Sequence, residues 1–378
     1  MNPILRSAIP LCLLAATAFA DYRIGAVYST KGELAPLDLP SWEGARAAAT
    51  AINKAGGIQG QMLRIELIPV DSTLGNVRSA MAKALADGKP WNGFVGLSDT
   101  DLALEAGRAT RRAGKVFITS GATSPRLPAA AGPRFFLACF GDNAQAAVAA
   151  EWLQSEKKAA RVAVIFDRTE TYTRLLKKYF ARAFRHAGGK IACETAFQPG
   201  QPVRITPSVL KADAVFLAAE TADEAQVLIR KLRSMGYPGP IVGGDGYDAP
   251  AKWRDPVVSK NVFYTTHAFP AKSPGSASPR AVAVFEKTLR KQSDRTAAGA
   301  FAGLGYDAVL LLASALEQSR GNDQAAASFL AEHGRLAGVT GPIRFITGGN
   351  RVPVKPVALV SAESGDRREI IPASVPRP

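Results

Sequence analysis

Short apolar runs alternate with amphipathic stretches along most of this chain. The first run, residues 22–28 (YRIGAVY), is rich in β-branched and aromatic residues and predicts a strand. Residues 41–54 then predict a helix with Ser41 as its N-cap, and two glycines at 56–57 end it. Strand–helix alternation with continuous apolar strands predicts a parallel sheet that is covered by helices on both faces.

This alternation runs to about residue 120 and then starts again. In the first series we expect further strands at 63–70, 93–97 and 116–120 and helices at 76–87 and 100–113. In the second series we expect strands at 135–139, 162–166, 190–195, 214–218 and 240–243 and helices at 143–157, 171–187 and 222–235. The restart predicts a second sheet of the same class.

The last third of the chain holds more helices than the second unit needs. A strand at 261–265 precedes helices at 279–291, 297–318 and 323–333, and a strand pair is expected at 343–345 and 355–360. We therefore expect the chain to return to the first unit and then to cross again near residue 340. The predicted fold is α/β, with two Rossmann-like doubly wound lobes on a multi-strand hinge. The expected N-terminal lobe is 21–140 with 267–339, and the C-terminal lobe is 141–266 with 340–378, ending in a frayed, proline-rich tail.

The first twenty residues have the pattern of a secretory signal peptide. Arg6 gives a positive start, residues 8–16 are apolar, and residues 18–20 form an A-x-A cleavage motif. The apolar core is about half of the roughly 20 residues that a membrane-spanning helix needs, and we expect no later run long enough to span. Export leaves Cys139 and Cys193, for which we favour two separate thiols while a disulfide stays open.

Composition and charge narrow the possible functions. With 378 residues and 47% hydrophobic residues the chain is long and apolar enough for two packed domains. A net charge of +15 admits nucleic acid, an anionic membrane surface, acidic ligands or merely a basic soluble protein, but export argues against DNA and RNA. The three histidines are scattered, and no HExxH, P-loop or G-x-S-x-G motif occurs. We therefore expect no metal, no cofactor and no enzymatic activity.

Five segments resemble the type I periplasmic solute-binding proteins, specifically the branched-chain amino acid and amide group that serves ABC transporters. In chain order they are WEGARAAATAINKAGGIQG, FVGLSDTDLALEAG, VFITSGATSP, VAVIFDRTETY and IVGGDGYDAP. The resemblance covers nearly the whole chain after the signal peptide. It implies a monomeric periplasmic receptor that closes two lobes on a small amphipathic ligand, an amino acid or related amide by preference, and delivers it to ABC permease subunits. An aromatic acid or lipid-like ligand, or a sensing role with a membrane signalling partner, stays open.

The resemblance also implies binding roles for individual residues. Thr100, Gly121 and Thr123 stand where family members hold the ligand head group. Thr100 also opens a predicted helix, whose free N–H groups suit a carboxylate, although it could instead be only an N-cap. Asp245 stands where the family takes the α-ammonium, in a Gly-Asp-Gly sequence that is also an ordinary turn. Tyr172 corresponds to a family aromatic.

The remaining candidates are expected to form the pocket walls. Leu37 and Trp42 would line the first lobe and Tyr247 the second. Two positions depart from the family, because Glu220 stands where relatives carry an aromatic residue and Phe301 where they carry tyrosine. Glu220 either faces the cleft, where it would receive a second amine or an amide, or it begins the next helix, whose first turn favours acids.

Overall fold

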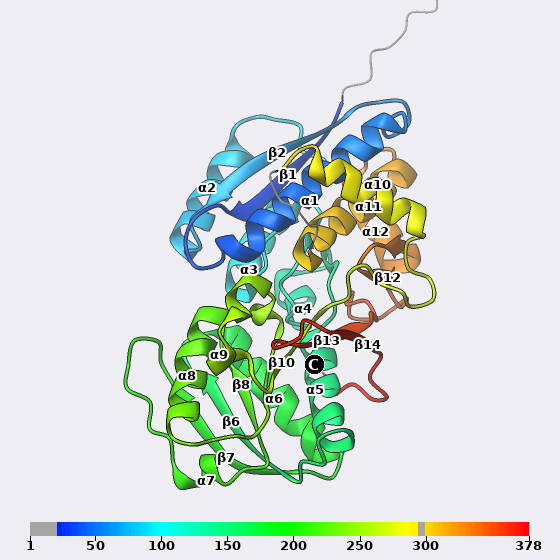
Figure 1. Cartoon of the computed structure of the whole chain (residues 1–378). Coiled ribbons are helices and arrows are strands. Elements are labelled where there is room, and N and C mark those ends of the chain that lie inside the picture. The colour runs from blue at the N-terminus through cyan, green and yellow to red at the C-terminus, as the bar shows by residue number, and fades with distance from the viewer. Residues whose placement is uncertain (1–20, 294–298, 378) are drawn as a thin grey trace, which may run out of the picture.

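The computed structural model describes residues 21–293 and 299–377, arranged as two α/β halves (Figure 1). The first half is built on a five-stranded sheet of order β2-β1-β3-β4-β5, in which all neighbouring strands are parallel. Every position of β3, β4 and β5 is buried, as expected for a sheet covered on both faces. The strands are β1 (Tyr22–Ser29), β2 (Leu63–Val70), β3 (Gly93–Gly96), β4 (Phe117–Thr119) and β5 (Phe135–Leu137).

Helices from both ends of the chain cover this first sheet. Early helices are α1 (Ala35–Lys54), α2 (Leu74–Ala86), α3 (Thr100–Arg112) and α4 (Leu127–Ala131). Late helices are α10 (Pro279–Arg290), α11 (Ala300–Ser319) and α12 (Asp323–His333). Residues of α11 share one apolar cluster with β1 and α1, and Figure 1 shows the yellow and orange late helices beside the blue α1. The helix α11 thus packs on the first sheet, in keeping with the expected return of the chain, which stays a prediction as a division into lobes.

Two glycines let α1 and α11 cross at close range. A Cβ atom added at Gly44 would lie 1.8 Å from the Ala302 carbonyl oxygen, and one at Gly305 would lie 1.9 Å from the Ser41 carbonyl oxygen. Ser41 itself lies inside α1, which begins at Ala35, so the predicted N-cap role of Ser41 is wrong. Pro36 stands in the first turn of α1, where its missing N–H costs nothing. The Ser41 hydroxyl instead donates to the Phe301 carbonyl at 3.0 Å.

The second half is built on a seven-stranded sheet of order β14-β13-β10-β9-β8-β6-β7. The strands β6 to β10 are parallel, whereas β13 and β14 are antiparallel to their neighbours. The strands are β6 (Arg161–Asp167), β7 (Lys190–Phe197), β8 (Ala214–Ala218), β9 (Ile241–Gly243), β10 (Val262–His267), β13 (Val357–Ser361) and β14 (Arg367–Ile370). The helical segments are α5 (Asp142–Ser155), α6 (Thr171–His186), α7 (Pro207–Leu210), α8 (Ala222–Ser234), η1 (Asp245–Tyr247), η2 (Pro250–Arg254) and α9 (Pro256–Ser259).

The end of the chain differs from the expectation. Strands lie near both positions predicted at 343–345 and 355–360, but they do not pair with each other. The strand β12 (Gly341–Arg344) pairs with β11 (Arg335–Gly338), while β13 joins β10. Ile343 and Phe345 pack in the apolar cluster of α11. Because these two residues pack in the first half, the chain would pass to the second half after residue 345 rather than near 340. The division into lobes at residues 140, 266 and 339 stays a prediction.

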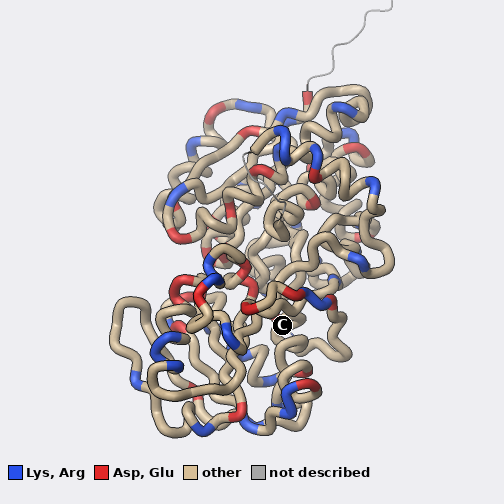
Figure 2. Tube along the Cα trace, in the orientation of Figure 1, with Lys and Arg blue, Asp and Glu red and all other residues tan. Residues whose placement is uncertain are grey.

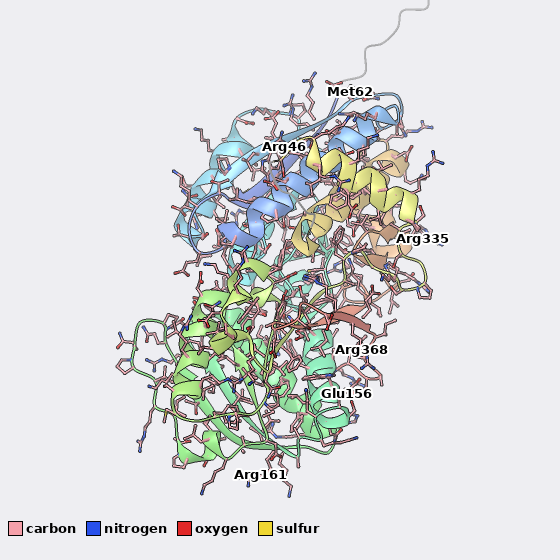
Figure 3. All side chains as sticks on the ribbon, viewed as in Figure 1. Arg46, Met62, Glu156, Arg161, Arg335 and Arg368 are labelled. Atoms are coloured by element: carbon pink, nitrogen blue, oxygen red, sulfur yellow. The ribbon has the colours of Figure 1, made fainter. Side chains whose placement is uncertain are left out.

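The described part of the tail is held on α5, so the expectation of fraying is wrong for residues 373–376. The Asn143 side chain donates to the Pro376 carbonyl at 2.8 Å, and Glu151 accepts the N–H groups of Ala373 and Ser374. A nearby ion pair joins Arg368 of β14 to Glu156 at the end of α5, at 3.2 Å, and Figure 3 labels both side chains.

Two further expectations concern the cysteines and the membrane. Cys139 and Cys193 are both free, as we favoured. By length and apolar composition α11 is, within the described ranges, a helix that could cross a membrane, so the expectation of no such run is wrong for α11. Because 83% of its most apolar window is buried inside the protein, α11 has the character of a core helix. The predicted signal peptide lies outside the described residues.

A buried lysine ties together the segments that connect the two halves. Lys355, 2% exposed, precedes β13 and donates to the Ala138 carbonyl after β5, at 2.8 Å, and to the Thr340 hydroxyl oxygen at 2.7 Å. Asp307 of α11 accepts the N–H groups of Thr340 and Val339 at 3.0 and 2.9 Å. Burial lowers the pKa of Lys355 to about 8, although the charge of Asp307 raises it.

We expect Lys355→Met to destabilise the protein strongly. The substitution keeps the apolar stem but removes the charge that compensates Asp307, and stranding a buried charge costs about 3 kcal/mol or more. Urea unfolding at neutral pH measures this, with Lys260→Met at an exposed position as the control. Equal midpoints for the two variants would contradict the role given to Lys355.

Candidate functional site

Loops at the carboxyl ends of strands from both sheets meet at the junction of the two halves. The loop after β3 brings Asp99, the loop after β6 brings Glu170, and the loop after β8 brings Glu220. One carboxylate oxygen from each of these three residues lies within 4.8 Å of the others. Parallel sheets bind ligands beyond the carboxyl ends of their strands, so this junction is the candidate site.

On the first-half side, Asp99 rather than Thr100 caps α3. The Asp99 backbone is extended, and Oδ1 accepts the Leu102 N–H at 2.8 Å, as an N-cap does. Thr100 is the first helical residue and is 4% exposed. The plain N-cap alternative for Thr100 is therefore wrong.

Gly121 and Thr123 follow β4 and are buried beside different partners. A Cβ atom at Gly121 would lie 2.6 Å from Ser98 Oγ and 3.1 Å from the Phe301 ring, so Gly121, Ser98 and Phe301 are in close contact. Thr123 donates its hydroxyl to Asp142 Oδ1, at the start of α5, at 2.6 Å. Burial, and then the charge of Asp245, raises the pKa of Asp142 to about 7.

Asp245 lies at the start of η1 and is held by donors of its own half. Its Oδ1 accepts from Gln145 Nε2 and from the Tyr172 hydroxyl, each at 2.7 Å, and Oδ2 lies 3.3 Å from His267 Nε2. The structure thus brings Tyr172 and Asp245 together. Burial lowers the pKa of His267, although the hydrogen bond and charge of Asp245 raise it.

An aromatic group connects Phe301 to this network. The His267 ring stacks on Phe140, with centroids 4.0 Å apart, and meets the Phe301 ring edge-on at 5.7 Å. Phe301 is in the first turn of α11, so the contact joins a helix of the first half to the end of β10 in the second. Phe301 therefore lies between Gly121 and His267, near the predicted head-group residues.

Tyr247, expected in the pocket wall of the second lobe, turns inward, and its wall role stays a prediction. Its side chain is fully buried in the second core, where the hydroxyl donates to the Leu217 carbonyl at 2.7 Å and the ring packs beside Trp253. The ring turns back over Gly243, where an added Cβ would lie 2.0 Å from it. The missing side chain at Gly243 makes that inward position possible.

Leu37 and Trp42 have different surroundings. Leu37 lines a pocket of about 270 Å³ between α1 and the start of α8. Trp42 is half-buried beside Tyr28, with ring centroids 6.4 Å apart, and is not part of that lining. The lining residues are Glu33, Pro36, Leu37, Thr221, Ala222, Asp223, Glu224, Gly246, Ala249 and Lys252.

Glu220 lies with the other carboxylates and does not begin α8. The helix begins at Ala222, its N-cap Thr221 accepts the Glu224 N–H, and the acids of its first turn are Asp223 and Glu224. Glu220 is 9% exposed, and its Oε2 has no hydrogen-bond partner. Burial, and then the neighbouring acids, raises the pKa of Glu220 well above its ordinary value.

Sequence reasoning missed Asp99, Glu170, Asp142, Gln145 and His267. Asp99 and Glu170 carry a usable signal, because each follows a buried parallel strand by three residues. Burial raises the pKa of Asp99 to about 6 and that of Glu170 to about 7, and neighbouring acids add to both shifts. Perturbed acids of this kind gather at functional sites.

Known proteins resemble this chain in sequence and in fold. A family model described as "Periplasmic binding protein" matches residues 21–367. The "Leu/Ile/Val-binding protein homolog 3" of Brucella melitensis is 27% identical over 84% of this chain and 85% of its own length. The "Amino acid binding protein" of Pseudomonas aeruginosa is 28% identical over 85% of each chain.

Solved structures share the fold at lower identity. A branched-chain amino acid transporter substrate binding protein from Streptococcus pneumoniae, in complex with isoleucine, has a TM-score of 0.78 at 23% identity, covering 93% of this chain and 100% of its own. A solute binding protein from R. palustris, in complex with benzoate, has a TM-score of 0.76 at 15% identity, covering 94% and 97%. The predicted fold class is thereby confirmed.

The buried acids predict an unusual dependence of stability on pH. In the folded protein the pKa is about 6 for Asp99 and about 7 for Asp142, Glu170 and Glu224, whereas in an unfolded chain each is about 4. Between about pH 4 and 7 the folded state therefore binds more protons, and stabilisation present below that window is lost as pH rises through it. Thermal melting of ligand-free protein should give a higher midpoint at about pH 5 than at about pH 7.5. A midpoint that climbs over this interval would refute the prediction.

Proposed function

The chain belongs to the periplasmic binding protein family, and from that premise we propose that it is a periplasmic receptor that captures a small amphipathic ligand between its two halves. An amino acid or a related amide is the proposed ligand, and ABC permease subunits in the inner membrane are the proposed recipients. The relatives named above as Leu/Ile/Val- and amino acid-binding proteins support this choice. Because the family consists of binding proteins, we infer that this chain binds its ligand without a cofactor and without changing it chemically. We also propose that it acts as a monomer.

One observation carries the proposal: buried polar groups from the parallel strands of both sheets converge at the carboxyl ends of those strands. On the first side we propose Thr100, the Gly121 carbonyl and the Thr123 hydroxyl as head-group contacts. Ser98 Oγ, beside Gly121, is buried and has no hydrogen-bond partner, so a polar ligand atom there would satisfy it. Thr123 would exchange its bond to Asp142 for one to the ligand.

On the second side we propose Asp245 and Tyr172. The bonds from Gln145 and Tyr172 fix the Asp245 carboxylate in one orientation before a ligand arrives. A carboxylate that meets an ammonium in a site sheltered from water forms a charge-assisted bond worth about 1.5–3 kcal/mol. Capture with a micromolar Kd requires about 8 kcal/mol, which a few such bonds and burial of an apolar stem can supply.

An aromatic acid is a second candidate ligand. Phe301, His267 and Phe140 form a continuous group of rings beside Gly121. A planar ligand would find a stacking partner there.

We expect Asp245→Asn to weaken amino acid binding about tenfold. The amide keeps an acceptor for Gln145 or Tyr172 but removes the charge that faces an ammonium. Isothermal titration calorimetry with a panel of amino acids measures the loss, and Asp366→Asn, at an exposed position between β13 and β14, is the control. Equal affinities for the Asp245 variant and the wild type would remove Asp245 from the proposed site.

Native mass spectrometry of protein purified from its own periplasm tests the ligand class directly. We expect a co-purified mass that fits an amino acid or amide. A fatty acid, sterol or aromatic acid in its place would replace the first candidate.

A further inference from the structure

We propose that Asp99, Glu170 and Glu220, the acid triad, form a subsite for an organic cation, so that the ligand carries an ammonium or guanidinium group at the end of an aliphatic stem. The inference rests on the proposed capture function and narrows its ligand to a basic amino acid or a related amine. It adds a second charged contact to the one proposed at Asp245.

The triad is assembled from both halves of the molecule. Asp99 comes from the β3 loop of the first sheet, and Glu170 and Glu220 come from the β6 and β8 loops of the second. Their carboxylate oxygens lie within 4.8 Å of one another, a separation at which like charges repel strongly in a poorly solvated place. In Figure 2, red acidic segments gather at this junction between the upper and lower halves. A positive charge between the three carboxylates would therefore favour the arrangement in which the two halves are close together.

The unsatisfied oxygen of Glu220 is a separate sign of a missing partner. Glu220 is 9% exposed, and its Oε2 accepts no hydrogen bond. A buried carboxylate oxygen without a donor is costly, and native proteins pair such atoms with protein, water or ligand. In its ionised form Glu220 accepts hydrogen bonds and donates none, so a cationic donor would both pair with Oε2 and relieve the repulsion among the three acids.

The protein does not supply this cation from the neighbouring wall. Lys252, the basic residue among the pocket lining, already pairs with Asp223 at 2.9 Å. The charges that act most strongly on Glu170 and Glu220 are all acidic, and after burial they raise the pKa of both groups. In the described parts of the chain, no lysine or arginine forms an ion pair with a member of the triad. The positive charge is therefore expected from outside.

The adjoining pocket suits an aliphatic stem. It is bounded by Thr221, directly after Glu220, and by Gly246, where an added Cβ would lie 2.1 Å from the Glu220 carbonyl oxygen. Pro36, Leu37 and Ala222 give it an apolar wall. Asp99, Glu170 and Glu220 are not among its lining residues, but the pocket adjoins Glu220 through Thr221, and its volume of about 270 Å³ is enough for a short methylene chain. A bare metal ion would make no use of this wall, which is why we assign an organic cation.

A comparison of lysine with norleucine measures the contribution of the cationic group separately from that of the aliphatic stem. Both have a four-carbon side chain, but only lysine ends in an ammonium. By calorimetry we expect L-lysine or L-arginine to bind wild-type protein about tenfold more tightly than L-norleucine. We expect Glu220→Gln to remove this preference by weakening lysine and arginine binding to about the level of norleucine. The matched control is Glu332→Gln, at an exposed position on α12, which should keep the preference.

The outcomes distinguish this inference from the proposed function. If norleucine or leucine binds as tightly as lysine, the acid triad is not a cation subsite, while amino acid capture stands. If a diamine such as putrescine binds through Glu220 and amino acids do not, the triad is supported and the amino acid assignment fails. If Ca²⁺, Mg²⁺ or Zn²⁺ binds chelator-treated protein through Glu220 and lysine does not compete, the organic cation is overturned.

A stability measurement separates a binding role from a structural one. In ligand-free protein at about pH 7.5, Glu220→Gln and Glu170→Gln should each raise the thermal midpoint, because each removes a buried carboxyl group whose ionised form the folded state disfavours. A structural role for these carboxylates would instead make both variants melt earlier. A raised midpoint together with lost lysine preference is the result that supports the triad.

Discussion

One buried ammonium group holds together the chain segments that pass between the two halves. Lys355 reaches the Ala138 carbonyl on one crossing and the Thr340 hydroxyl beside the β11–β12 hairpin, while Asp307 of α11 holds the backbone of Thr340. Burial costs both charged groups, and only their mutual compensation makes the arrangement tolerable. The contacts of Lys355 and Asp307 thereby hold α11 beside the segments that connect the two halves.

The position of α11 in turn determines part of the geometry of the candidate site. With α11 fixed, its first turn places Phe301 against Gly121 and His267. The close glycine crossing of α11 with α1 then determines where α1 lies, and with it the pocket wall that contains Leu37. Contacts deep in the hinge region thus position side chains that no local sequence feature would bring together.

Local pattern was sufficient for most of the fold, because buried parallel strands are recognisable as continuous apolar runs. Counting helices was enough to expect α10 to α12 beside the first sheet, where α11 packs against β1 and α1. Other features depend on contacts between distant residues. Tyr247 turns inward only because Gly243 offers it space, and α1 starts before Ser41 because Pro36 suits a first helical turn. The local sequence identifies Asp99 only as a helix cap. Its position beside Glu170 and Glu220 depends on how three separate loops come together.

The acid triad also affects the free energy of bringing the two halves together without a ligand. Because Asp99 belongs to one half and the two glutamates to the other, each step of approach does work against like charges unless a counter-charge lies between them. On the proposed function, an unloaded receptor would spend more of its time apart, and the joined surface offered to a permease would report that cargo is present. Neutralisation of the acid triad by the ligand, and not only the fit of the ligand's shape, would then favour the closed form that a permease recognises.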